Sequence, residues 1–148
     1  MIEFHAGSGP DTQAVGIALE EMFLSYRLMP GRAPLPVIAI GGARVVGGPS
    51  IIMALARKTG RFLPETDTQA WLDAARPDIA ALDALLAASE FASGKYSVTD
   101  MALYPRLAGD REGWSSHANI MRWMTVLSKR PALGRGMSVI VPGPISGR

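Results

Sequence analysis

The sequence predicts an α/β part followed by an all-α part. Short apolar runs bounded by glycine and proline fall within residues 1–64, as is typical of strands joined by turns. From residue 65 on, apolar residues recur at three- and four-residue steps, which is typical of helices with one buried face. We therefore predict two units, an α/β unit over 1–64 and a helical unit over 65–148.

The first three elements are predicted to be a strand, a helix and a strand. The run "IEFH" at 2–5 reads as a strand that opens into the turn-rich "AGSGP". Apolar positions on one face predict a helix over 12–24, and "LSYRLM" at 24–29 predicts a second strand. The segment "PGRAP" at 30–34 predicts a loop, because its two prolines and its glycine leave no room for a helix.

A hairpin and a helix complete the first unit. Two apolar runs on either side of Gly41-Gly42 predict a β-hairpin over 37–46. Pro49 suits the first position of the next helix, since its missing N–H would be unpaired there anyway. Gly60 is a suitable terminator, because glycine readily adopts the left-handed conformation that ends many helices.

The second unit is predicted to contain only helices. Two short helices fit between Glu65 and Gly94, with Pro77 between them and a capping box at "TDTQ", 66–69. A second capping box pairs Ser97 with Asp100, at the start of a helix that Pro105 is expected to kink or end. A last helix is expected over 116–129, ended by "KRP".

Composition argues against several classes of function. The net charge is only +2 and the basic residues are scattered, so we do not expect nucleic-acid binding. With no cysteine and only His5 and His117, we expect no metal site. No apolar run approaches the ~20 residues that span a bilayer, and no signal peptide is recognisable, so a cytoplasmic protein is expected.

Several segments, in order, resemble the glutathione S-transferase family, especially its bacterial Nu-type branch. "AVGIALEEMFLSY" resembles the first helix of that fold, and "SIIMALARKTGRFLP" resembles its third helix and exit. "GKYSVTDMALYPRL" and "NIMRWMTVLSKRPALGRGM" resemble its capping box and its tryptophan-bearing helix. The resemblance implies a thioredoxin-like N-terminal lobe and an all-α C-terminal lobe in minimal form, with "PGRAP" in place of the family's second helix.

The resemblance also implies where a catalytic hydroxyl would lie. Nu-type members carry a Thr-Pro-Asn motif after the first strand, whose polar groups stabilise the thiolate of glutathione. This sequence has Gly9, Pro10 and Asp11 there, so the threonine is missing and a carboxylate, which would raise a thiol pKa, replaces the amide. Ser8 and Thr12 flank the motif and are the candidate catalytic residues. Alternatively, these residues serve only in turn formation and N-capping, since Asp11 or Thr12 can cap the first helix.

Two more segments would hold glutathione if it binds. "LPVI" resembles the family's segment with a cis proline, so Leu35 and Pro36 would pair with the cysteinyl part. An ungapped alignment puts Gly47-Gly48 at the family's acid–serine pair, which holds the γ-glutamyl end; a shift of two residues would instead recover Ser50. The candidate ligand-binding residues are therefore Pro10, Leu35, Pro36, Gly47, Gly48 and Ser50, and no metal ligand is predicted.

Two hypotheses of function follow from the degenerate motifs. In one, the chain is a non-catalytic or weakly glutathione-binding module that contacts a protein partner or forms a homo-oligomer. In the other, it is a minimal glutathione-dependent transferase or reductase. The missing acid–serine pair and threonine favour the first hypothesis.

Overall fold

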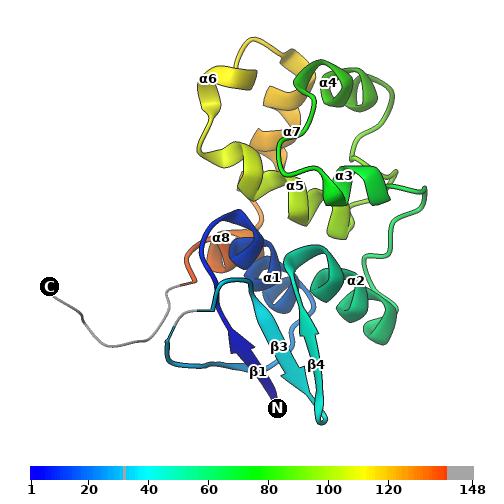
Figure 1. Cartoon of the computed structure of the whole chain (residues 1–148). Helices are drawn as coiled ribbons and strands as arrows, with labels where there is room; N and C mark the ends of the chain where they lie inside the picture. Colours follow the sequence, from blue (N-terminus) through cyan, green and yellow to red (C-terminus); the bar gives the residue numbers. More distant parts are fainter. Residues whose placement is uncertain (32, 140–148) are drawn as a thin grey trace, which may run out of the picture.

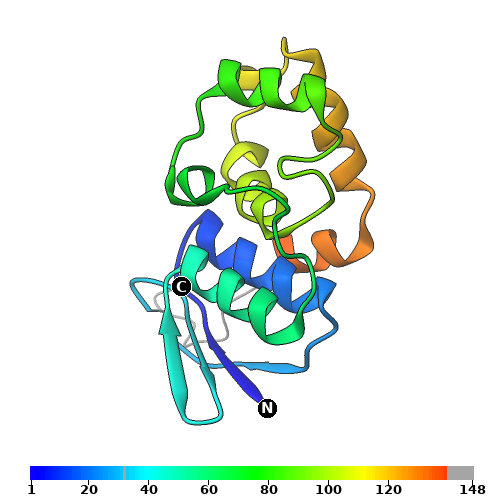
Figure 2. The same ribbon diagram turned by 90° about the vertical axis from the view of Figure 1, so that its right-hand side faces the viewer.

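A computed structural model describes residues 1–31 and 33–139 of the chain. A four-stranded sheet lies at one end, and most of the helices of the second half lie at the other (Figure 1). Two helices, α1 (Pro10–Glu21) and α2 (Gly48–Thr59), lie side by side between the sheet and those helices (Figures 1 and 2). The boundary at residue 64 stays a prediction.

The sheet has the order β2-β1-β3-β4. Its strands are β1 (Ile2–His5), β2 (Tyr26–Leu28), β3 (Val37–Ile40) and β4 (Ala43–Val46). β1 is parallel to β2 and antiparallel to β3, and β3 and β4 form the predicted hairpin. The alternation of apolar residues in β1 places Phe4 in the core, fully buried.

Proline lies at the start of both α1 and α2, as predicted for α2 only; α1 begins and ends earlier than the predicted range of 12–24. Pro10 and Pro49 lie in the first turns of α1 and α2, where a missing N–H costs little. Gly60 ends α2 in the left-handed conformation, with φ of 69°. No helix lies between β2 and β3 in the described residues of that segment, as "PGRAP" predicts.

The second half contains six helices within the described residues. They are α3 (Gln69–Asp73), α4 (Ile79–Ala88), α5 (Val98–Ala108), α6 (Arg111–Trp114), α7 (Ala118–Ser128) and α8 (Pro131–Met137). α3 and α4 are the two short helices expected before Gly94, and Pro77 lies between them. None of the helices in the described ranges is long and apolar enough to cross a membrane.

The capping box at the start of α5 is confirmed. The Ser97 hydroxyl accepts a hydrogen bond from the Thr99 N–H, and the Asp100 carboxylate accepts one from the Ser97 N–H at 3.0 Å. The same carboxylate accepts from the indole N–H of Trp123, on α7, at 2.8 Å. The cap therefore also joins two helices.

Pro105 does not end α5, which was one of the two outcomes expected for it: the helix continues to Ala108, with Leu103 and Leu107 buried on either side of the proline. One prediction for a helix end was wrong. The capping box at 66–69 does not form, since α3 begins only at Gln69. The Thr66 hydroxyl instead lies 3.1 Å from that of Ser93.

The helix α8 was not predicted, and it packs closely on α1. The contact is made at two glycines, Gly16 on α1 and Gly136 on α8. A Cβ atom on Gly136 would collide with the backbone of Ile17, and one on Gly16 would lie 2.9 Å from the Gly136 carbonyl oxygen. The absence of both side chains is therefore what lets the last described helix touch the first.

Candidate functional site

Three backbone segments that the sequence marked as a glutathione site meet beside the start of α1. They are the loop after β1, residues 33–36, and the turn between β4 and α2. The Ala33 N–H donates to the Ala6 carbonyl at 3.0 Å, and the Gly47 N–H donates to the Pro36 carbonyl at 2.8 Å. By glycine groove we mean the junction of these three backbone segments, which contains Gly7, Gly47 and Gly48.

Gly7 is a point of close approach between the first two segments. A Cβ atom there would lie 3.0 Å from the Pro36 nitrogen and 3.1 Å from the Leu35 carbonyl carbon, which is tighter than most real contacts. A side chain here would push against this backbone, so glycine suits the close approach of the loop after β1 to residues 35 and 36. Leu35 is about half exposed, at 53%, while Pro36 is buried.

The prediction of a cis proline at Pro36 was wrong, because the described chain contains no cis peptide bond. The trans form is the more stable isomer of a bond before proline, by ~0.5–1 kcal/mol. Here it is compatible with the hydrogen bond that the Pro36 carbonyl accepts from Gly47. Nothing in this loop therefore requires the less stable isomer.

The two candidate catalytic hydroxyls lie in different environments. Ser8 is exposed in the loop before α1. Thr12 is buried, at 5% exposure, and its hydroxyl oxygen accepts a hydrogen bond from the Gly7 N–H at 2.8 Å. The buried hydroxyl of Thr12 thus holds the loop after β1 in place through its hydrogen bond with Gly7. Of the two candidate residues, only Ser8 is exposed to solvent.

The turn into α2 brings Gly48 against Asp11. Gly47 has a φ of 92° and Gly48 is buried at the first position of the helix, while Ser50 is exposed. A Cβ atom on Gly48 would lie 2.8 Å from the Asp11 Cγ and 3.1 Å from its Oδ2. The carboxylate of Asp11 therefore lies at the N-terminal end of α2, which attracts anions.

Arg106, on α5, is a residue of this region that the sequence did not point to. Its side chain is only 4% exposed, and its Nη2 lies 3.4 Å from the Asp11 Oδ1. The same guanidinium donates to the carbonyls of Trp71, Leu72 and Ala74 at 2.8–3.0 Å. A cation suits these carbonyls because they lie at the C-terminal end of α3. An isolated arginine in "YPRL" has no pattern that would have predicted this role.

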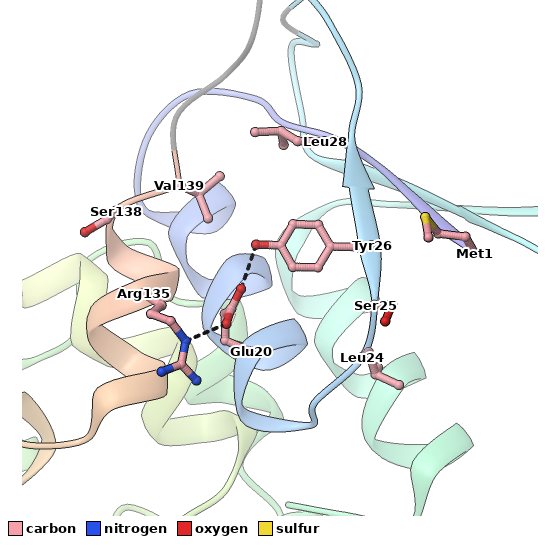
Figure 3. Close-up of a pocket in the computed structure, with 9 residues that line it drawn as sticks. All are labelled: Met1, Glu20, Leu24, Ser25, Tyr26, Leu28, Arg135, Ser138 and Val139. Atoms are coloured by element: carbon pink, nitrogen blue, oxygen red, sulfur yellow. Dashed lines mark hydrogen bonds and ion pairs between the residues drawn. The ribbon is translucent and has the colours of Figure 1, made fainter.

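A cavity of about 690 Å³ lies beside the last turn of α1 (Figure 3). At its centre the Glu20 carboxylate accepts from the Tyr26 hydroxyl at 2.9 Å and from the Arg135 Nε at 2.7 Å. Burial and the neighbouring carboxylate raise the pKa of Tyr26 to about 12. The described residues contain no group of three or more His, Cys, Asp or Glu that could hold a metal ion.

Solved structures of glutathione transferases resemble this chain over almost its whole length. Glutathione transferase YghU from Streptococcus pneumoniae ATCC 700669, complexed with glutathione, has a TM-score of 0.81 and 19% identity, and the match covers 96% of this chain and 84% of that one. The theta class enzyme of Xanthomonas axonopodis pv. citri, in apo form, has a TM-score of 0.77 and 16% identity, with 95% and 98% covered.

A third similar structure is URE2P6 of Phanerochaete chrysosporium in apo form. Its TM-score is 0.77 at 21% identity, and the match covers 91% of this chain and 95% of that one. A scan of protein-family models and a search of curated proteins found no match to the sequence. At sequence identities this low, the structural similarity establishes the fold alone. The chain thus has the fold of the glutathione transferases, with a thioredoxin-like first half and a helical second half.

Proposed function

We propose that this protein is a non-catalytic member of the glutathione transferase fold, which binds glutathione weakly in the glycine groove and works through protein contacts. The observation that carries the proposal is the position of Asp11 against Gly48, at the start of α2. A negative side chain at this point opposes both a bound carboxylate and a thiolate.

The electrostatic argument concerns the N-terminal end of α2. Free N–H groups and the helix dipole make such an end favourable for an anionic group of a ligand. Pro49 lacks an N–H, and the Asp11 carboxylate already lies beside Gly48. Arg106 offsets part of this charge at 3.4 Å, although it also serves three backbone carbonyls. A second anion here would therefore bind weakly.

Two points support glutathione as the ligand: the backbone of the glycine groove and the ligands of similar proteins. The YghU structure is described as complexed with glutathione, and that of a Burkholderia graminis transferase as having two glutathione molecules bound per subunit. Contacts from the backbone at Leu35 would not depend on the side chains that this sequence lacks. These points support glutathione as the ligand and leave its thiol without an activating group.

The role in protein contact is supported by apolar side chains left in solvent. Leu35 is 53% exposed and Val46, on the edge strand β4, is 51% exposed. The partner would be another protein or a second copy of this chain. Apolar surface of this kind is typical of interaction sites when it is contiguous.

The alternative function, a minimal glutathione-dependent transferase or reductase, is favoured by one observation. Ser8 is exposed in the loop before α1, where a hydroxyl would be available to a thiol. Orienting the sulfur by this single donor would be enough for some catalysis, since the thiolate is the nucleophile.

Calorimetry with glutathione tests the proposal. We expect the wild-type protein to bind with a Kd weaker than ~1 mM, and Asp11→Asn to bind about tenfold more tightly, because the amide keeps the shape and removes the charge. Asp110→Asn, at an exposed aspartate outside the groove, is the matched control and should leave the Kd unchanged.

An assay of glutathione conjugation to an aryl halide separates the two functions. We expect the wild-type rate to equal the uncatalysed rate. A clear rate above that background that Ser8→Ala abolishes would establish the enzyme and contradict the proposal. Tight binding by the wild-type protein, with no gain in Asp11→Asn, would contradict the electrostatic argument.

A further inference from the structure

The far end of α1 carries a feature that the proposed function does not use, which is an exposed phenylalanine in a left-handed conformation. Phe23 has a φ of 55° and is 79% exposed. It follows the C-cap Met22, and its N–H donates to the Glu20 carbonyl while that of Leu24 donates to Leu19. This is the position where helices usually have glycine.

The comparison with α2 shows how unusual Phe23 is in this molecule. α2 ends with Gly60 at a φ of 69°, which costs glycine nothing. At Phe23 the same conformation is unfavourable for a residue with a Cβ, and the exposed ring gains little from burial. Phe62, two residues after Gly60, also has a positive φ, of 61°. Backbone outliers of this kind gather at functional sites.

Both phenylalanines line one cleft of about 610 Å³, between the end of α1, the segment after α2 and the start of α8. We call it the basic cleft, because its lining also includes Arg61, Lys129, Arg130 and Arg135. The Arg61 guanidinium lies over the rings of Phe23 and Phe62, with 5.8 and 5.5 Å to the centroids. Apolar surface and positive charge are thus combined in one place.

The positive charge of the basic cleft is only partly neutralised. The acidic residue of its lining is Glu21, which is buried and receives Arg130 at 2.7 and 3.0 Å. Arg135 is paired with Glu20 at 2.7 Å. Arg61 and Lys129 form no salt bridge in the part of the chain that the structure describes. For a chain with a net charge of +2, this is a local concentration of positive charge.

We propose that the basic cleft is the docking site for an acidic, apolar segment of a protein partner, with Phe23 as its central contact. Charge complementarity selects carboxylates for Lys129 and Arg61, and the rings of Phe23 and Phe62 select an apolar anchor between them. A protruding aromatic beside arginine is typical of protein interfaces. A small-molecule site would instead enclose its aromatic residues.

The basic cleft and the glycine groove lie at opposite ends of α1. This helix has 12 residues and is therefore about 18 Å long. A segment in the cleft would leave the glycine groove free. The inference consequently does not rest on glutathione binding, and each can fail without the other.

The test uses an amphipathic peptide with leucines at three- and four-residue steps and glutamates elsewhere, labelled for fluorescence anisotropy. The control peptide has glutamine in place of every glutamate. We expect saturable binding of the acidic peptide that weakens with added salt, and none of the control peptide. Amide shifts in NMR spectra should fall on Phe23, Phe62 and Lys129.

Two variants with matched controls complete the test. Phe23→Gly suits the left-handed backbone, so we expect an unchanged or raised unfolding midpoint together with at least about tenfold weaker peptide binding. Val126→Ala, at an exposed apolar residue outside the lining of the cleft, should bind normally. Lys129→Gln should weaken binding severalfold, whereas Lys95→Gln, at an 87% exposed side chain outside the cleft, should not.

Three results would overturn the proposal. One is equal binding of the acidic and glutamine peptides, and another is full binding by Phe23→Gly. The third is binding of a naphthalene sulfonate in the cleft without any binding of the peptide, which would assign the cleft to small anions. Glutathione calorimetry on Phe23→Gly should match the wild-type protein whatever the peptide result.

Discussion

At the scale of single residues, Asp100 shows how one carboxylate can hold several elements together. It is fully buried, and its oxygens accept hydrogen bonds from the N–H groups of Ala92 and Ser97 and from the indole of Trp123, at 2.8–3.0 Å. Burial raises the pKa of this carboxyl, and the hydrogen bonds oppose that shift. One side chain thus caps α5, fixes the loop before it and anchors α7.

We expect Asp100→Ala to lower the free energy of unfolding by about 3 kcal/mol, because three buried donors lose their acceptor and the helix loses its cap. Urea unfolding followed by tryptophan fluorescence measures this change. Asp110→Ala is the control, since Asp110 is exposed and makes no capping hydrogen bond, and it should cost less than about 0.5 kcal/mol. Similar costs for the two variants would contradict the assigned role.

At the scale of helices, the contact between α1 and α8 depends on the absence of side chains. We expect Gly136→Ala to lower the free energy of unfolding by about 2 kcal/mol, because its Cβ would collide with the backbone of Ile17. Gly134→Ala lies in the same helix with nothing within 4 Å, so it should raise stability by roughly 0.5–1 kcal/mol. Thermal unfolding of both variants, measured by circular dichroism, should therefore give changes of opposite sign.

The elements that the sequence predicted well are those with local causes. The hairpin at Gly41-Gly42 and the cap at Ser97 follow from turn and capping chemistry, which involves residues close in sequence. α8 was missed because "PALGRGM" has poor helix propensity. It forms through packing on α1, which no local pattern reveals.

The candidate site also has features with local causes, which the sequence predicted, and features that depend on tertiary packing, which it did not. The sequence identified the backbone segments that meet in the glycine groove. The Asp11 carboxylate beside Gly48 and its contact with Arg106 depend on tertiary structure, since Arg106 is 95 positions away. The expectation of a cis proline at Pro36 was wrong; it came from the resemblance alone and from no pattern in the residues of this loop.

At the scale of the whole molecule, the three tyrosines resist ionisation together. Burial and Glu20 raise the pKa of Tyr26 to about 12, burial and Glu21 raise the pKa of Tyr96, and burial raises the pKa of Tyr104. In an unfolded chain all three would titrate near ~10. Above pH ~10, where the tyrosines of the unfolded chain lose their protons, the native state therefore binds more protons than the unfolded state.

We expect the contribution of Tyr26 to stability to be fully present below pH ~10 and to be lost as the pH rises through about 12. A titration of phenolate absorbance should show Tyr26 ionising only as the pH approaches about 12 while the fold is intact, instead of near ~10. Tyr26→Phe should leave the titration of the other two tyrosines unchanged and remove the pH-dependent contribution of Tyr26 to stability. A native tyrosine that ionises at its ordinary pKa would contradict the prediction.

The contact of α8 with α1 also has a consequence for how the chain acquires its structure. The ion pair that joins these helices, between Glu20 and Arg135, spans 115 positions in the sequence. Contacts between segments so distant form late, because a long loop must first be closed. During synthesis, the face of α1 that α8 covers must therefore wait for almost all the described residues to be made. Until then that face is open to aggregation or to a chaperone.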